Sequence, residues 1–297
     1  MKLTSLHLLL TYKCNLSCDH CFVWGNPRQN GSMRLDNIHL ILQQAKGIGS
    51  IRRIYFEGGE PFLYYSLLQQ AVKSANQYGF EAGIVTNAFW ARSFEYALTK
   101  LQPFVGIVKD LSISSDLYHW NKRYEKNVRY AYLAAEKLGI PVGTISVAQP
   151  EDVDVVHPIG QRPFGESAVM YRGRAAVNLA SRAPKRHWEG FNKCPHEDLR
   201  ELGRVHLDPG GNVLICEGIL LGNIFENSLE EIFSLYDPDL HPVLAPLVAG
   251  GPAELVRKYN LSHETHFADA CHLCYQSRQS LVMEFPDILL PAHIYEH

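Results

Sequence analysis

The stretch TYKCNLSCDHCF, residues 11–22, places three cysteines within eight positions, at Cys14, Cys18 and Cys21. The apolar run SLHLLLT (5–11) leads into it and predicts a strand, so the cysteines fall on the loop that leaves this strand. Three thiolates on one loop can hold three irons of a 4Fe–4S cluster and leave the fourth iron open. An open coordination position indicates a reactive cluster rather than an electron carrier.

A zinc site is the alternative for this loop, because a thiolate set also suits zinc. His20 is adjacent, but its place between two of the cysteines is awkward for closing a tetrahedron. Simple packing is a poor explanation, since three thiols of one loop lie beside Asp19 and His20.

The composition excludes several classes of protein. The chain has 297 residues, 28 basic and 31 acidic side chains and a net charge of −3, which gives no sign of nucleic-acid or polybasic membrane binding. It has no run of 18 apolar residues, and its start is too quickly polar for a signal peptide, so we expect a cytoplasmic protein. Cytosolic thiols stay reduced, and seven cysteines therefore point to metal binding or catalysis rather than to disulfides.

Strand and helix patterns alternate along the first 175 residues, which predicts a parallel sheet with right-handed crossovers. A closed eight-stranded barrel needs about 250 residues, so we expect a partial (β/α)6 TIM-like barrel of the α/β class. Strands are predicted at 5–11, 53–56, 80–86, 110–114, 140–147 and 167–172, and helices from Asp36, at 66–79, from Ser93 and at 121–138.

The pattern changes after this region. We predict a barrel domain at 1–175, a linker at 176–192 and a small C-terminal domain at 193–297. Within the last domain, RVHLDPGGNVLIC (204–216) predicts a hairpin, and NSLEEIF (227–233) begins with a capping box.

Unusual residues follow the first four predicted strands. The three-cysteine loop follows the first, EGGEP (57–61) the second, TNA (86–88) the third and SSD (114–116) the fourth. The carboxyl ends of parallel strands meet at one edge, where α/β folds build their sites. We therefore expect one site at this edge.

Cys14-x3-Cys18-x2-Cys21, together with GGEP and the strand–helix alternation, resembles the signature of the radical S-adenosylmethionine (SAM) enzymes over roughly residues 5–172. The resemblance implies that these cysteines bind three irons of a 4Fe–4S cluster and that SAM chelates the fourth. It also implies reductive cleavage of SAM to a 5′-deoxyadenosyl radical, which removes a hydrogen atom from the substrate. An electron donor such as flavodoxin or ferredoxin would supply the electron.

The same resemblance implies the residues that contact SAM. They are Phe22, Gly58, Gly59, Glu60, Pro61, Asn87, Ser114 and Asp116. The GGEP segment would receive the methionine ammonium, because glycines allow close approach and Glu60 accepts from a cation. Two features depart from the family pattern. His20 stands where an aromatic residue is usual, and GTISVAQPE (143–151) lacks a second glycine, which leaves the adenine contacts open.

Four cysteines remain, at Cys194, Cys216, Cys271 and Cys274, and four thiolates close a metal site. They resemble the shortened auxiliary-cluster (twitch or SPASM-like) domain of some radical SAM enzymes, which implies a second 4Fe–4S cluster. A four-cysteine zinc site is the alternative, because a hairpin plus CxxC also describes a zinc ribbon. A third possibility is that Cys216 or Cys194 is a hydrogen-atom donor, with His196 as a possible ligand.

The resemblance is strongest to members that modify ribosomally made peptides, by epimerisation or crosslinking. The first strand begins by residue 5, so we expect a separate partner protein to bind any leader peptide. A radical SAM oxidoreductase of a small metabolite or sugar is the alternative. A non-enzymatic iron–sulfur carrier or zinc-stabilised binding module is the alternative from another class. Tyr118, His119, Tyr171, Arg172 and Arg174 are candidates to line the substrate site, and the two arginines could hold a carboxylate.

Overall fold

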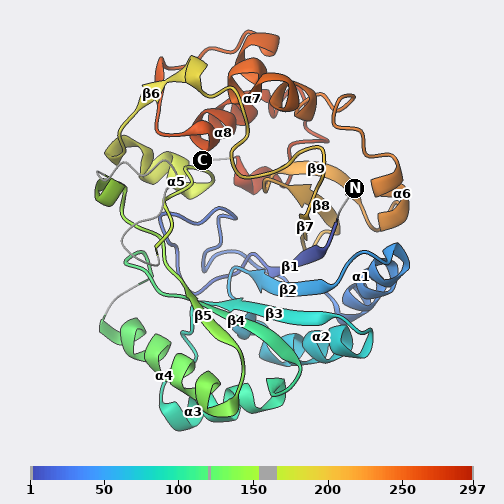
Figure 1. The fold of residues 1–297 in the computed structure, drawn as a ribbon, viewed down its shortest axis with the longest axis vertical. Coiled ribbons are helices and arrows are strands. Elements are labelled where there is room, and N and C mark those ends of the chain that lie inside the picture. Colours follow the sequence, from blue (N-terminus) through green and yellow to red (C-terminus); the bar gives the residue numbers. More distant parts are fainter. Residues whose placement is uncertain (1–2, 120–121, 154–165, 296–297) are drawn as a thin grey trace.

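The computed structural model describes residues 3–119, 122–153 and 166–295 (Figure 1). The first residue of the helix predicted at 121–138 lies outside these ranges, as do residues 154–165 between the fifth predicted strand and the linker.

One eight-stranded sheet forms the centre of the molecule, in the order β5-β4-β3-β2-β1-β7-β8-β9. The strands from β5 to β7 in this order pair in parallel, and β8 and β9 continue as antiparallel strands. Their bounds are β1 Ser5–Thr11, β2 Arg53–Gly58, β3 Glu81–Thr86, β4 Val108–Ser114, β5 Val142–Ile145, β7 Arg204–Leu207, β8 Asn212–Ile215 and β9 Ile219–Asn223. The predicted α/β class is confirmed.

Helices connect the parallel strands. They are α1 Leu35–Ile48, α2 Tyr65–Gln77, α3 Phe94–Leu101 and α4 Lys122–Leu138. The apolar face of α1 is buried, which the spacing of Ile38, Ile41 and Leu42 predicts. Ser93 caps α3 as predicted, because its side chain accepts from the backbone N–H of Tyr96.

Two details of the predicted elements are wrong. Helix α1 begins at Leu35, so Asp36 lies inside its first turn and does not start it. Residues 167–172 are not a strand; within the described chain this stretch makes a single bridge, from Ser167 to Val147. The sixth parallel strand is β7, which pairs with β1 on the side opposite β2.

The C-terminal third joins the same sheet through β7, as Figure 1 shows where β1 and β7 lie side by side. The predicted hairpin is confirmed as β7 and β8, and the capping box of Ser228 and Glu231 opens α6. Further elements are α5 Arg174–Asn178, β6 Arg186–His187, α6 Leu229–Ser234, α7 Leu244–Tyr259, β10 His266–Phe267 and α8 Ala270–Leu281. Short 3-10 turns are η1 Pro61–Tyr64, η2 Gln102–Phe104, η3 Pro150–Val153, η4 Ala180–Arg182, η5 Trp188–Gly190 and η6 Ala292–Ile294.

Secondary structure continues through the stretch predicted as a linker. Strand β6 pairs antiparallel with β10, which ties residues 186–187 to the C-terminal third. The division into domains therefore stays a prediction. Among the described residues, no helix is both long enough and apolar enough to span a membrane.

Candidate active site

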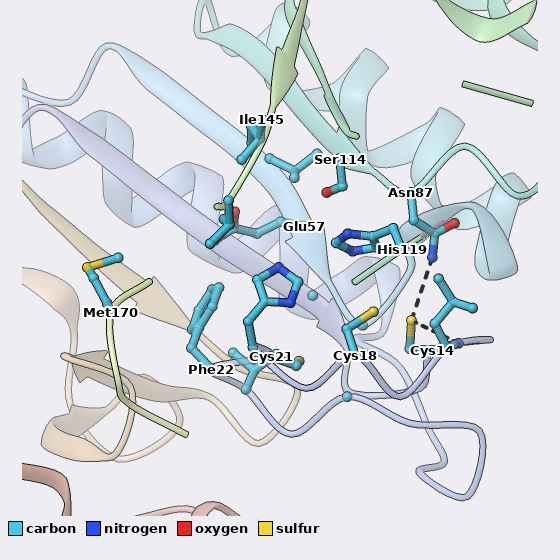
Figure 2. A pocket seen from close by; sticks show the side chains of 18 of the residues that line it. Cys14, Cys18, Cys21, Phe22, Glu57, Asn87, Ser114, His119, Ile145 and Met170 are labelled. Atoms are coloured by element: carbon cyan, nitrogen blue, oxygen red, sulfur yellow. Dashed lines mark hydrogen bonds between the residues drawn. The ribbon is translucent and has the colours of Figure 1, made fainter. Parts of the chain in front are cut away.

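A pocket of about 300 Å³ opens at the carboxyl ends of the parallel strands, and we call it the sheet-edge pocket. Residues from all four predicted motifs meet there, and Figure 2 shows Cys14 and Cys18 near Asn87, Ser114 and His119. Its lining includes Cys14, Leu16, Cys18, His20, Cys21, Phe22, Val23, Gly25, Glu57, Gly58, Gly59, Val85, Thr86, Asn87, Ser114, His119, Ile145, Val147, Ser167, Ala168, Val169, Met170 and Arg172.

Arg174 holds the loop that carries the three cysteines. Its two terminal nitrogens donate to the backbone carbonyls of Cys18, at 2.6 Å, and of Gly25, at 2.8 Å. Its backbone N–H donates to the carbonyl of Cys21 at 2.9 Å. Arg174 is 6% exposed, its guanidinium is committed to the loop, and it does not line the sheet-edge pocket, against the expectation that it lines the substrate site.

Burial keeps the thiols of Cys14 and Cys18 protonated. It raises the pKa of Cys14 to about 12, with the nearby Glu60 carboxylate adding to the rise. It also raises the pKa of Cys18 well above its ordinary value. Thiolates in such a place need a cation, which fits a metal-binding loop.

Gly58 and Gly59 lie directly against the backbone that leads into the cysteine loop. A Cβ on Gly59 would meet the carbonyl oxygen of Lys13 at 2.1 Å, and one on Gly58 would meet that of Thr11 at 2.3 Å. The N–H groups of Gly59 and Glu60 donate to the same two carbonyls, at 2.7 and 2.9 Å. The glycines are therefore required by this close packing, and both also line the pocket.

Glu60 and Pro61 lie away from the pocket, against the expectation that their side chains contact a ligand. Glu60 is fully buried, and its carboxylate accepts hydrogen bonds from the backbone N–H of Phe62, at 3.0 Å, and of Asn87, at 2.7 Å. The hydroxyl of Thr86 donates to it at 2.8 Å. Burial raises the pKa of Glu60 to about 7, although these three donors oppose the rise. Its role is to join β2 to the end of β3.

Asn87 and Ser114 line the pocket from the ends of β3 and β4. The side-chain amide of Asn87 donates to the Asn15 oxygen at 3.0 Å and lies 3.7 Å from the Cys14 sulfur. The Asn87 side chain is therefore placed beside the cysteine loop by direct contacts.

Asp116 is buried behind the pocket lining rather than in it. One of its oxygens lies 2.7 Å from Nδ1 of His119, and the other lies 3.6 Å from Nε2 of His20. Burial lowers the pKa of His20 to about 4, whereas the hydrogen bond with His119 lowers the pKa of Asp116 against the effect of burial. Asp116 therefore orients His119 and lies beside His20, and the two histidines line the pocket in its place.

The Radical SAM superfamily model matches residues 8–153, the segment that contains the cysteine loop and the ends of β2, β3 and β4. Residues 8–153 are a radical SAM domain. The superfamily accounts for the cysteine spacing, the GGEP segment and the parallel sheet of this radical SAM protein.

Two curated relatives share part of its length. The S-adenosylmethionine-dependent nucleotide dehydratase of Fibrobacter sp. (strain UWH6) is 30% identical over 134 residues, 40% of this chain and 34% of that protein. The putative peptide biosynthesis protein YydG of Bacillus subtilis (strain 168) is 30% identical over 111 residues, 37% of this chain and 35% of that protein. The radical SAM protein thus matches about a third of the length of each relative.

A solved structure confirms the fold. The crystal structure of BtrN in complex with AdoMet and 2-DOIA superposes with a TM-score of 0.51 at 17% identity. The superposition covers 78% of the radical SAM protein and 82% of BtrN.

Glu57 is a pocket residue that the sequence analysis missed. It lines the sheet-edge pocket, and its Oε1 lies 3.1 Å from Nδ1 of His7 and 3.2 Å from Nε2 of His206. His7 and His206 are register partners on the parallel strands β1 and β7, so the cluster depends on a pairing that sequence periodicity does not show. The available signal was Glu57 itself, an acidic residue at the end of a buried apolar strand.

A second cavity holds the four remaining cysteines, and we call it the cysteine cavity. Cys194, Cys216, Cys271 and Cys274 all line it, from three separate parts of the C-terminal third, because Cys271 and Cys274 are both on α8. The hydrogen bond between Cys194 and Cys216 lowers the pKa of Cys194 to about 6 and raises that of Cys216. Burial raises the pKa values of Cys271 and Cys274.

Two buried guanidinium groups, Arg172 and Arg278, also line the cysteine cavity. Arg278 is 2% exposed, and it donates to the carbonyls of Cys216 and Glu217 and to the hydroxyl of Tyr295. Among the described residues it has no carboxylate within ion-pair distance. The Nε atoms of both arginines are buried without a hydrogen-bond partner in the described chain. Two buried guanidinium N–H groups without a partner fit an anionic thiolate group in this cavity.

The described chain does not bring three of these sulfurs within zinc-binding distance of one another. Zinc holds sulfurs about 2.3 Å from the ion, which puts them within about 4 Å of one another. The described chain contains three groups of possible ligands whose atoms lie within 4.8 Å of one another, and none of these groups contains three cysteines. One of them joins Cys271 with His196 and Asp269, so His196 lies close enough to be an alternative ligand.

Proposed function

We propose that this radical SAM enzyme binds a 4Fe–4S cluster through Cys14, Cys18 and Cys21 and binds SAM in the sheet-edge pocket. The supporting observation is that the three cysteines share one pocket with Gly59, Asn87, Ser114 and other residues from four adjacent strand ends. When bound, the cluster and SAM supply reductive cleavage of SAM and removal of a hydrogen atom from a carbon of the substrate.

The chain itself supplies positioning and exclusion of water. Arg174 fixes the backbone of the cysteine loop, and Asn87 places an amide against it. Phe22 and Met170 give the pocket an apolar wall, which Figure 2 shows beside Cys21 and Glu57. An apolar, partly closed pocket keeps water away from a reactive carbon and holds it close to the group that attacks it.

We further propose a second 4Fe–4S cluster in the cysteine cavity, held by Cys194, Cys216, Cys271 and Cys274. The gathering of the four cysteines in one cavity and the two buried arginines beside them support it. Neither Cys194 nor Cys216 lines the sheet-edge pocket, which favours ligand roles for both over hydrogen-atom donation. An electron donor of the flavodoxin or ferredoxin type would reduce the enzyme.

We propose a ribosomally made peptide as the substrate class, modified by epimerisation or crosslinking. The similarity to a putative peptide biosynthesis protein supports this proposal. A small-metabolite oxidoreductase is the second candidate, favoured by the similarity to a nucleotide dehydratase.

Anaerobic reconstitution tests these proposals. We expect about eight irons per chain in the wild type and about four in a Cys14→Ala, Cys18→Ala, Cys21→Ala variant. With dithionite and SAM, only the wild type should form 5′-deoxyadenosine. About four irons plus one zinc in the wild type would make the cysteine cavity a zinc site. Zinc without iron, and no 5′-deoxyadenosine, would overturn the whole proposal.

The substrate class needs a separate assay. We expect candidate peptides to raise the rate of 5′-deoxyadenosine formation above its rate without substrate. The same assay with nucleotides and sugars tests the second candidate, and stimulation by these alone would exclude the peptide proposal.

A further inference from the structure

Arg172 belongs to both candidate sites. Among the described residues that line the sheet-edge pocket and the cysteine cavity, it alone lines both. Its side chain is 11% exposed, and its guanidinium carbon lies 5.0 Å from the centre of the Phe22 ring. The positive charge of Arg172 therefore lies close to both candidate sites.

A continuous series of buried ionic contacts leads from Arg172 back to the pocket. Nη1 of Arg172 lies 2.8 Å from Glu217, and the other oxygen of Glu217 lies 3.2 Å from Nδ1 of His206. Nε2 of His206 lies 3.2 Å from Glu57, which lines the sheet-edge pocket. Each of these side chains is at most 12% exposed, so water screens their charges weakly.

The strand register explains why this series crosses the sheet. Glu57 is on β2, and His206 is on β7, one strand beyond β1. Glu217 follows β8 directly after Cys216, so the last carboxylate lies next to a proposed cluster ligand. The ionic series therefore connects the sheet-edge pocket with the cysteine cavity.

Buried ion pairs of this kind are a costly way to stabilise a fold. Removing each charge from water costs several kcal/mol in real proteins, and well-packed apolar residues often serve stability as well. The arrangement also leaves Nε of Arg172 without a partner in the described chain. Fold stability alone therefore does not account for it.

We propose that Arg172 is a positioning residue that raises the reduction potential of the iron–sulfur cluster in the cysteine cavity, and that Glu217, His206 and Glu57 link this potential to the sheet-edge pocket. The proposal rests on the second cluster of the proposed function. Reduction adds one electron to the cluster and changes no bond. A nearby cation, and an N–H group that can donate to a cluster sulfur, both favour the more negative reduced state.

The test is a redox titration of the cysteine-cavity cluster, followed by electron paramagnetic resonance. The Cys14→Ala, Cys18→Ala, Cys21→Ala chain carries this cluster alone, so its signal is unambiguous. Arg172→Gln should shift the midpoint potential to more negative values, whereas Arg172→Lys should keep most of the wild-type value. Arg200→Gln is the matched control, since it removes an exposed arginine that pairs with Asp239.

Iron and sulfide analysis accompanies each titration and shows that the cluster is intact. An unchanged potential in Arg172→Gln with a full cluster would overturn the proposal, and so would zinc in the cavity. If the triple variant does not fold, the titration uses the chain with all seven cysteines. There the two signals are distinguished by adding SAM, which alters only the cluster that binds it.

Glu57→Gln tests the link to the pocket. Removing a carboxylate at the far end of the series should shift the potential in the opposite direction, and less than Arg172→Gln does, because His206 lies between. No shift would overturn the link. Failure of the proposed function is seen separately, as absence of 5′-deoxyadenosine from the wild type.

Discussion

Arg174 stabilises the cysteine loop through backbone carbonyls rather than through an ion pair. Hydrogen bonds that involve a charged group contribute about 1.5–3 kcal/mol each, so losing two of them should loosen the loop. We expect Arg174→Gln to bind markedly less iron at Cys14, Cys18 and Cys21 and to form less 5′-deoxyadenosine. Iron analysis after anaerobic reconstitution measures the first effect.

Arg182→Gln is the control for this prediction, because Arg182 is an exposed arginine of the same region that pairs with Glu151. This variant should bind as much iron per chain as the wild type. Equal iron content in the two variants would show that the Arg174 contacts do not hold the loop.

At the scale of single residues, the sequence predicted which side chains gather but not always which way they face. The cysteines and glycines share one pocket, as expected, because their spacing in the sequence is that of local loops. Their roles in binding a cluster and SAM stay predictions. Glu60 was expected to bind a ligand, yet its carboxylate accepts the N–H groups of Phe62 and Asn87. Glu57 and His206 were missed because their contact depends on strands about 150 residues apart in the chain.

At the scale of elements, Gly173 sets how closely the segment before α5 approaches the cysteine loop. It has a φ of +56°, and a Cβ there would meet the Cα and carbonyl oxygen of Phe22 at 2.6 Å. Gly173→Ala should therefore cost on the order of 1–3 kcal/mol from backbone strain, beyond the steric clash. We expect a lower unfolding temperature and reduced iron binding at the loop, measured by circular dichroism and iron analysis.

Gly190→Ala is the matched control for Gly173→Ala, because no atom lies within 4 Å of the added Cβ. It should leave both quantities close to wild type. If Gly173→Ala behaves in the same way, the two segments are not as tightly apposed as the structure shows.

Element prediction from periodicity succeeded for strands and helices with one buried face. It failed at SAVMYR (167–172), whose short apolar run is typical of a strand. The backbone there turns at Gly173 to meet the cysteine loop, and the place beside β1 is taken by β7. Which strand fills an edge depends on long-range pairing, and no local pattern reports it.

At the scale of the whole molecule, β1 is an interior strand with partners on both sides. A fragment of residues 1–192 lacks β7 and exposes the edge of β1, so it should aggregate or lack a cooperative unfolding transition. Size-exclusion chromatography and thermal circular dichroism of the fragment and the full chain measure this. A monomeric fragment with a sharp transition would instead support independent domains with a boundary near residue 192.

The two arginines of the cysteine cavity have a consequence for the lifetime of the protein. Without metal, burial keeps the thiols of Cys271 and Cys274 protonated, and among the described residues the buried charge of Arg278 has no carboxylate within ion-pair distance. Because unmatched buried charges favour local unfolding, we expect the metal-free C-terminal third to be cut readily by proteases. Oxygen damage that removes iron from this cavity would therefore lead to degradation of the chain. The abundance of the protein would then depend on the supply of iron.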